Sequence, residues 1–227
     1  MRLKMLVASQ KDSSALDMDI SHLVIAGWAG RDAEAMEHHI RELEALGVPR
    51  PKETPTFYRA AAARLTVAEE IEVLGTASSG EVEPVIFAQK GALYVGVGSD
   101  HTDRAAETHG VALSKQMCDK PIAGTVWPFA EVEQHWDDLI LRSWRVDDES
   151  RSLYQEGKVS GLLTPKDLIQ RYAGSEGLAD GTAMFGGTLP AIGGIETAGR
   201  LECELEDPVL SRSITFGYNI GSLPIAG

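Results

Sequence analysis

Two glutamates placed two positions apart are one sign of chemistry in this sequence. Glu81 and Glu83 flank Val82 in the segment SGEVEPVIF, and side chains two apart on a strand project from the same face. Two carboxylates on one face repel each other unless water or a shared cation compensates their charge. Surrounded by water, they form only the polar half of an amphipathic strand. On a shared cation, their hard oxygen atoms suit Mg²⁺ or Mn²⁺ better than Zn²⁺.

A polar cluster also follows directly on an apolar run. Residues 91–98, GALYVGVG, are small and apolar, and the next six residues, SDHTDR, include Asp100 and end in Arg104. The run predicts a buried strand whose end presents several polar side chains together. The neighbours His101 and Asp103 could support a functional Asp100 by hydrogen bonds, and a solvated turn explains them nearly as well.

A histidine and a glutamate share one face of a helix that the pattern predicts over residues 31–46, with Gly47 as its C-terminal cap. At 100° per residue its apolar stripe consists of Met36, Ile40, Leu43 and Leu46. His39 lies within this stripe and Glu42 at its edge, so a carboxylate can orient an imidazole that acts as general base. His38 points to the other side. Such pairs are common on helices, and most often the histidine lies at the edge of the core and forms a hydrogen bond to the carboxylate without any catalytic role.

The composition limits the partners and the compartment. With 227 residues and 43% hydrophobic content, the chain suffices for one large domain. Its formal net charge of -13, without any Lys/Arg-rich run, argues against nucleic acid and anionic membranes, so an anionic substrate needs a local positive centre. The only two cysteines, Cys118 and Cys203, imply no disulfide framework. No segment approaches the ~20 apolar residues of a membrane span, and the first apolar run is too short for a signal peptide. We therefore expect a cytoplasmic protein.

The elements that must position these side chains are mostly short strands. Strands are expected at residues 22–28, 54–59, 81–88, 91–98, 138–146 and 182–187, with a hairpin over 200–220. Short helices are expected near 129–136 and at 164–172, where Thr164 is the N-cap. The pattern lacks a regular alternation of strands and helices, and it predicts a β-rich α+β fold.

In their order along the chain, these motifs resemble those of the fumarylacetoacetate hydrolase family, and more narrowly a divergent branch, the DUF2848 proteins. The series consists of His39-Ile40-Arg41-Glu42, PRPKETPTF, Glu81-Val82-Glu83, Gly98 to Arg104, Ser114-Lys115-Gln116, YQEGKVSGLLTPKDLIQRY and GGTLPAIGG. The similarity covers roughly residues 25–193. A shared order of motifs is more specific than any one of them.

The resemblance implies a fold and a metal site. The fold is a mixed β-sheet roll or barrel with peripheral short helices, in a single domain over residues 1–227, with residues 1–20 as an N-terminal strand or arm. Glu81, Glu83 and Asp100 match the family residues that hold a divalent metal, usually Mg²⁺, so we expect Mg²⁺ or Mn²⁺ as the cofactor.

The resemblance also implies which residues surround the metal. Lys115 matches the lysine that faces the same pocket, and Arg104, Gly187 and Thr188 are expected to bind the substrate. The sequence departs from the family pattern at several positions, such as Ser99, where the family has asparagine. None of these departures removes a charged site residue, and the altered loops are those that shape the pocket.

The implied function is a metal-dependent hydrolase or lyase that cleaves a carbon-carbon bond in a small 2-oxo or 1,3-dicarbonyl acid through a metal-bound enolate. His39 and Glu42 would take a proton from the attacking water, and the helix at 31–47 would act as a lid. A decarboxylase, hydratase or tautomerase would use the metal and Lys115 without that water. A non-catalytic binding protein of the same fold is a further alternative. The family also implies a homodimer that binds a small anionic substrate.

Overall fold

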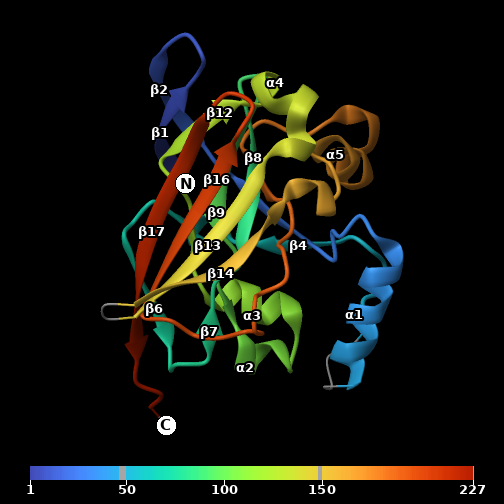
Figure 1. Cartoon of the computed structure of the whole chain (residues 1–227), viewed down its shortest axis with the longest axis vertical. Coiled ribbons are helices and arrows are strands. Elements are labelled where there is room, and N and C mark those ends of the chain that lie inside the picture. The colour runs from blue at the N-terminus through green and yellow to red at the C-terminus, as the bar shows by residue number, and fades with distance from the viewer. Residues whose placement is uncertain (46–49, 148–149, 227) are drawn as a thin grey trace.

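An eight-stranded mixed sheet forms one layer of the protein (Figure 1). The structure is a computed structural model that describes residues 1–45, 50–147 and 150–226. In spatial order, the strands of this sheet are β2 (Ser13–Asp19), β1 (Arg2–Ala8), β12 (Thr125–Pro128), β9 (Ala92–Ser99), β8 (Val82–Gln89), β15 (Thr182–Phe185), β3 (His22–Gly27) and β4 (Thr56–Ala60). The pairs β1–β12 and β15–β3 are parallel, and the other pairs are antiparallel.

A five-stranded sheet packs against the first one and lies in front of it in Figure 1. Its strands, in spatial order, are β14 (Ser150–Lys158), β13 (Ile140–Asp147), β16 (Arg200–Asp207), β17 (Arg212–Leu223) and β6 (Glu70–Leu74). Two short strand pairs lie outside both sheets: β7 (Ser78–Ser79) with β10 (Thr102–Asp103), and β5 (Leu65–Thr66) with β11 (Lys120–Pro121).

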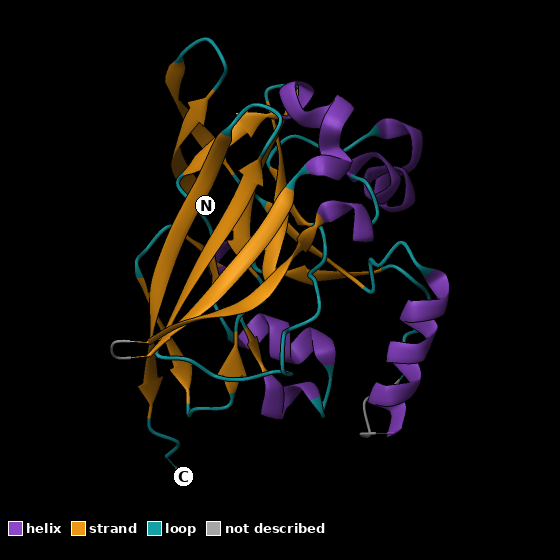
Figure 2. Ribbon diagram, viewed as in Figure 1, coloured by secondary structure: helices purple, strands orange, loops and turns teal. Residues whose placement is uncertain are grey.

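The helices are short and lie around the strands (Figure 2). They are α1 (Ala33–Ala45), α2 (Arg104–Glu107), α3 (Val111–Met117), α4 (Phe129–Val132) and α5 (Pro165–Ala173), with 3-10 turns at Ala62–Arg64, Glu133–Asp138, Val159–Gly161 and Gly174–Glu176. The Thr164 side chain caps α5 by accepting a hydrogen bond from the N–H of Asp167, as the sequence predicts. None of the described helices is long and apolar enough to cross a bilayer.

Strand β8 is buried on both faces, because it lies between two apolar clusters. Val82 and Ile86 contribute to the cluster between the two sheets, whereas Val85 and Phe87 point into a second cluster on the other side. A strand covered on both faces has a near-continuous apolar sequence, as this one does. Glu83 is therefore buried together with the strand, and Glu81, just before the strand begins, is partly buried.

The observed elements confirm the predicted β-rich fold with a curled mixed sheet and peripheral helices. The expected helix is α1, and the expected hairpin at 200–220 is β16–β17. Residues 1–20 form the hairpin β1–β2 at one edge of the large sheet. The expected cap Gly47 lies outside the described residues. Strand β14 was not expected, because the sequence SRSLYQEGK shows no alternation of apolar and polar residues.

Candidate metal centre

The register of β8 and β9 brings three carboxylates together. Glu83 lies opposite Gly98, and the N–H of Asp100 donates to the carbonyl of Glu81 over 2.9 Å just beyond the strand ends. Opposing residues of an antiparallel pair share a face, so Asp100 comes next to Glu81. Each of Glu81, Glu83 and Asp100 offers an oxygen within 4.8 Å of the other two. We call these three residues the carboxylate cluster.

A glycine holds the carboxylate of Glu83. The register of β8 with β15 ends at Val85, and the carbonyl of Pro84 next to it accepts from the N–H of Gly186 over 2.9 Å. The chain beyond β15 then turns, and the N–H of Gly187 donates to Oε2 of Glu83 over 2.8 Å. Gly187 has a φ of 94°, and a Cβ there would lie 2.8 Å from Cβ of Ala29. Only glycine fits at this position.

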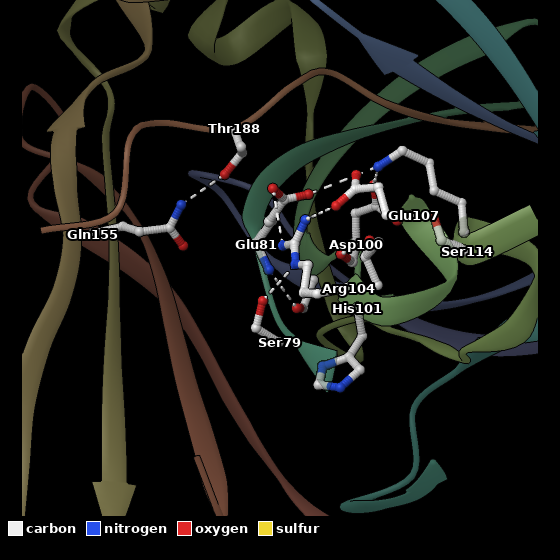
Figure 3. Close-up of polar contacts among 12 residues, drawn as sticks. Ser79, Glu81, Asp100, His101, Arg104, Glu107, Ser114, Gln155 and Thr188 are labelled. Carbon is white, nitrogen blue, oxygen red and sulfur yellow. Dashed lines mark hydrogen bonds and ion pairs between the residues drawn. The ribbon is translucent and has the colours of Figure 1, made fainter. Parts of the chain in front are cut away.

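The peptide units on either side of Val82 are held by two side chains from other elements. Oε1 of Gln155 accepts from the N–H of Val82 over 3.0 Å, and the hydroxyl of Thr188 donates to its carbonyl over 2.8 Å. Gln155 also donates to Thr188 Oγ1 (2.8 Å) and to the carbonyl of Leu189 (2.6 Å), as Figure 3 shows for Thr188. Because Val82 separates the two glutamates, these bonds fix the direction of both.

Three cationic side chains surround the carboxylate cluster. Nζ of Lys115, on α3, donates to Oδ2 of Asp100 and lies 3.7 Å from Oε2 of Glu81. Nζ of Lys120 lies 3.4 Å from Oδ1 of Asp100, and Arg104 approaches Glu81 to 3.1 Å. Figure 3 shows Arg104 between Glu81 and Glu107. The positive charge that an acidic protein needs for an anionic ligand is thus concentrated here.

The charges of the site shift its pKa values in opposite directions. Burial and the neighbouring charge of Asp100 raise the pKa of Glu83 well above its usual value. Burial also pushes the pKa of Asp100 upwards, but Lys115 and Lys120 outweigh it, and the pKa is lowered. For Lys115, burial favours the neutral amine, but Asp100 and Glu81 outweigh it, and the pKa is raised. The site therefore stabilises a carboxylate–ammonium pair and leaves Glu83 short of positive charge.

The donor set fits a hard divalent cation. Oδ1 of Asp100 is buried and accepts no hydrogen bond from the part of the chain that the structure describes. Nζ of Lys120 lies 3.4 Å from it and donates to two backbone carbonyls, so this oxygen can take a further cation. Three carboxylates leave about half of an octahedral Mg²⁺ shell, with ligands at about 2.0–2.1 Å, to water or substrate. The cluster contains neither imidazole nor thiolate, which Zn²⁺ prefers.

A buried hydrogen-bonded chain supports the turn behind Asp100. The ring of His101 lies between Ser78 Oγ and the hydroxyl of Tyr218, at 2.9 Å from each. Tyr218 in turn contacts Ser99 Oγ over 2.8 Å, and Ser99 Oγ accepts from the N–H of Glu81. Burial lowers the pKa of His101 to about 3, so the ring is neutral. Ser99 thus holds the turn through its contacts with Glu81 and Tyr218.

The structure places most of the predicted site residues in one region. Beside the carboxylate cluster lie Lys115, Arg104, Gly187 and Thr188. Their described contacts are with the chain itself, and substrate binding by the last three stays a prediction. His39 and Glu42 lie on α1, but their side chains fall outside the part of the chain that the structure describes. Their role as a catalytic pair also stays a prediction.

Sequence reasoning missed Lys120. This lysine is fully buried, and Nζ donates to the backbone carbonyls of His101 (2.6 Å) and Cys118 (3.1 Å). The segment KQMCDKP has no pattern that indicates a buried lysine, because the position depends on the pairing of Lys120 with Leu65 in β5–β11. A pairing across more than fifty positions leaves no local signal.

Both cysteines are expected to be unreactive in the native protein. Cys118 and Cys203 are buried, burial raises the pKa of Cys118 to about 11, and burial also raises the pKa of Cys203. A thiol reagent should therefore modify neither residue rapidly in native buffer and both in guanidinium chloride, because the thiolate is the reactive form. The check is a time course with a chromogenic disulfide reagent. Fast release of one equivalent from the folded protein would contradict it.

One family model matches most of the chain. The model of the DUF2848 family, described as a protein of unknown function, matches residues 26–218. The chain belongs to the DUF2848 family. The match includes the carboxylate cluster, Lys115, Lys120 and both residues of the proposed His39/Glu42 pair. Among curated proteins, no sequence matches this DUF2848 member.

Solved structures with the same fold include a fumarylacetoacetate hydrolase family protein. Cg1458 with an inhibitor superposes with a TM-score of 0.67 at 18% identity, covering 94% of this chain and 81% of that chain. The yeast protein ynq8, a fumarylacetoacetate hydrolase family protein, gives 0.63 at 16% identity, with 92% and 96% covered. A 2-keto-3-deoxy-D-arabinonate dehydratase complexed with magnesium and 2,5-dioxopentanoate gives 0.62 at 15% identity, with 91% and 75% covered. This DUF2848 protein therefore has a fumarylacetoacetate hydrolase-like fold, and the predicted resemblance is confirmed.

Proposed function

We propose that the chain is a divalent-metal-dependent enzyme that cleaves a carbon-carbon bond in a small 2-oxo or 1,3-dicarbonyl acid. The observation that carries this proposal is the carboxylate cluster, in which Glu83 and Asp100 are buried and Glu81 is partly buried, with Lys115, Lys120 and Arg104 around it. Glu81, Glu83 and Asp100 would hold Mg²⁺ or Mn²⁺. A cation in this position supplies Lewis-acid polarisation to a bound carbonyl and attraction for the neighbouring carboxylate.

The surrounding residues have separate roles in this proposal. Lys115 places an ammonium beside the carbonyl oxygen on which negative charge develops. Gly187 and Thr188 keep the glutamates aligned, and Arg104 adds positive charge at the edge of the cluster. His39, oriented by Glu42, takes the proton from the attacking water if the reaction is a hydrolysis.

The helix that carries His39 has a fixed base. The N–H of Arg31 donates to the carbonyl of Gly161 over 2.8 Å, and the guanidinium of Arg31 pairs with Asp137. α1 follows directly and stands at the side of the molecule in Figure 1. We propose that it closes as a lid over bound substrate from this anchored end, which would exclude bulk water from the reacting carbon.

A dehydratase acting on a sugar-derived 2-oxo acid is the second candidate. It is favoured by the likeness of fold to the 2-keto-3-deoxy-D-arabinonate dehydratase described with magnesium. Loss of water needs the carboxylate cluster and Lys115 but no attacking water, so the His39/Glu42 pair separates the two reactions. Decarboxylase and tautomerase activities would likewise not depend on the His39/Glu42 pair.

The test is a substrate panel with purified protein and Mg²⁺ or Mn²⁺. Acylpyruvates report hydrolysis, oxaloacetate reports decarboxylation, and 2-keto-3-deoxy sugar acids report dehydration. The expected result is turnover of the acylpyruvates that chelator stops and added metal restores. Metal-dependent turnover of the sugar acids alone would favour the dehydratase. No metal binding and no turnover anywhere on the panel would contradict the proposal.

Two neighbouring histidines provide an internal control for hydrolysis. His39→Ala is expected to reduce hydrolysis by about 100-fold and to leave Mn²⁺ and oxalate binding nearly unchanged, because the metal ligands belong to other elements. His38→Ala should have little effect, since adjacent helical residues are 100° apart. Both variants are compared in steady-state assays and binding titrations. Equal losses in the two variants would exclude the proposed dyad.

The expected oligomeric state rests on the family resemblance, and the expected location rests on the low cysteine content. We propose a homodimer in the cytoplasm, and light scattering coupled to size-exclusion chromatography tests the first part. A monomer at micromolar concentration would contradict it.

A further inference from the structure

The ammonium of Lys115 lies where a cation would contact the carboxylate cluster. Nζ donates to Oδ2 of Asp100, lies 3.7 Å from Oε2 of Glu81, and is also attracted by Glu83. Within the described residues, no hydrogen bond ties this ammonium to the backbone. The side chain is buried at the end of a flexible four-carbon stem. Among the described residues, the polar contacts of this ammonium are thus with carboxylates.

Lys120 differs from Lys115 although both face the same aspartate. Its Nζ donates to the carbonyls of His101 and Cys118, and it lies 3.4 Å from Oδ1 of Asp100. These two backbone bonds hold Lys120 whether or not the carboxylate is available. To move away from Asp100, Lys120 would have to break its two backbone hydrogen bonds. Lys115 would not, because no described backbone group bonds to its ammonium.

A divalent cation and Lys115 compete for the same carboxylates. Mg²⁺ needs carboxylate oxygens at about 2.0–2.1 Å. Oδ1 of Asp100 is open to it, but Nζ of Lys115 bonds the other oxygen of that carboxylate and lies 3.7 Å from Oε2 of Glu81. A divalent ion and an ammonium on the same three carboxylates also repel each other strongly at such short range. Because Lys120 is fixed, the ammonium that moves is that of Lys115.

We propose that Lys115 is the resident counter-cation of the metal-free carboxylate cluster, that it leaves Asp100 when a divalent cation binds, and that it then contacts an anionic ligand beside the cation. This inference rests on the proposed metal centre. It gives one side chain two opposite effects: Lys115 weakens metal binding, because it must be displaced, and it strengthens the binding of an anion to the metal-loaded protein. A purely structural lysine has no reason to show effects of opposite sign.

The experiment compares the wild-type chain with Lys115→Met, which keeps an apolar stem and removes the charge. Free Mn²⁺, measured by its electron paramagnetic resonance signal, gives the metal affinity without any assay of activity. The dissociation constant for Mn²⁺ is expected to fall by about tenfold or more. Oxalate binding to the Mn²⁺-loaded variant, measured by calorimetry, is expected to weaken by about tenfold or more.

Two further variants keep the test decisive. Lys4→Met removes the same charge from an exposed position on β1 and should leave both affinities unchanged. Lys115→Arg keeps the positive charge and should not bind Mn²⁺ more tightly than wild type. Circular dichroism shows whether Lys115→Met folds. If it does not, Lys115→Arg replaces it in the test, and tighter Mn²⁺ binding by Lys115→Arg than by wild type would overturn the inference.

The outcomes separate this inference from the proposed function. Equal or weaker Mn²⁺ binding by Lys115→Met, with normal binding by wild type, overturns the displacement of Lys115 and leaves the metal centre intact. Tighter Mn²⁺ binding with unchanged oxalate affinity overturns the contact with the anion. Absence of Mn²⁺ and Mg²⁺ binding in the wild-type chain overturns both the metal centre and this inference.

Discussion

Glu83→Ala is expected to weaken Mg²⁺ or Mn²⁺ binding by more than about 100-fold, and with it to remove metal-dependent turnover. Changes to residues that only support metal ligands cost about 10–100-fold in affinity, so the loss of a ligand should cost more. Glu83 is 3% exposed and its carboxylate is held by the N–H of Gly187. Neither water nor a neighbouring side chain can readily take its place.

Calorimetric titration with Mg²⁺ and thermal unfolding with and without the metal measure this effect. A ligand at 100 times its dissociation constant stabilises the folded state by about 2.7 kcal/mol, so wild type should melt higher with Mg²⁺ and Glu83→Ala should not. Glu72→Ala is the matched control, because Glu70 and Glu72 have the same spacing on β6 but are exposed. Unchanged Mg²⁺ binding in Glu83→Ala would rule out the three-ligand site.

The glutamate pairs of this chain show what the sequence could and could not predict. The spacing of Glu81 and Glu83 recurs at Glu70 and Glu72, and again along β16. On β16 the glutamates are the polar face of an amphipathic strand, where Arg142 pairs with two of them. Spacing alone therefore does not separate a metal site from a solvated strand. What separates them is burial on β8, which depends on both sheets.

Local patterns predicted the elements that depend on nearby residues. Helix α5 has its N-cap and first-turn proline within four residues, and β8 and β9 are contiguous apolar runs. Strand β14 depends instead on pairing with β13 across a register shift at Ser143, which its polar sequence does not indicate. Lys120 likewise takes its place through the distant strand β5. The three candidate metal ligands could be proposed from the sequence, whereas the buried Lys120 beside them could not.

The order of the family motifs indicated residues that the structure brings together, and the contacts around β8 give a physical reason. Gln155, Thr188 and Gly187 come from segments far from β8 in sequence, yet each bonds to Val82 or Glu83. A metal ligand pair of this kind needs distant parts of the chain at fixed distances. Because several segments must each supply a residue to one site, their motifs occur in a constant order along the chain.

Gln155→Leu is expected to lower the free energy of unfolding by about 4 kcal/mol, because each buried polar group left without a partner costs about 1–3 kcal/mol. Gln155 is 1% exposed, and all its bonding positions are used. Leucine would strand the N–H of Val82, the carbonyl of Leu189 and the hydroxyl of Ser143. Urea denaturation followed by circular dichroism measures the loss.

Gln155→Leu should also weaken metal binding. A loss of stability alone would not weaken it at temperatures where the variant is still folded. The two glutamates are aligned by the peptide units that Gln155 and Thr188 hold, and without Gln155 the loop at 186–189 keeps only its bonds to β8. We expect Mg²⁺ affinity to fall by about 10–100-fold in folded Gln155→Leu. Gln134→Leu, an exposed position in the turn Glu133–Asp138, should change stability by no more than about 0.5 kcal/mol and leave Mg²⁺ affinity unchanged. If folded Gln155→Leu bound Mg²⁺ as tightly as wild type, the side chain would hold the sheets together without positioning the ligands, and the alignment of Glu81 and Glu83 would have to come from Gly187 and the β8–β9 register alone.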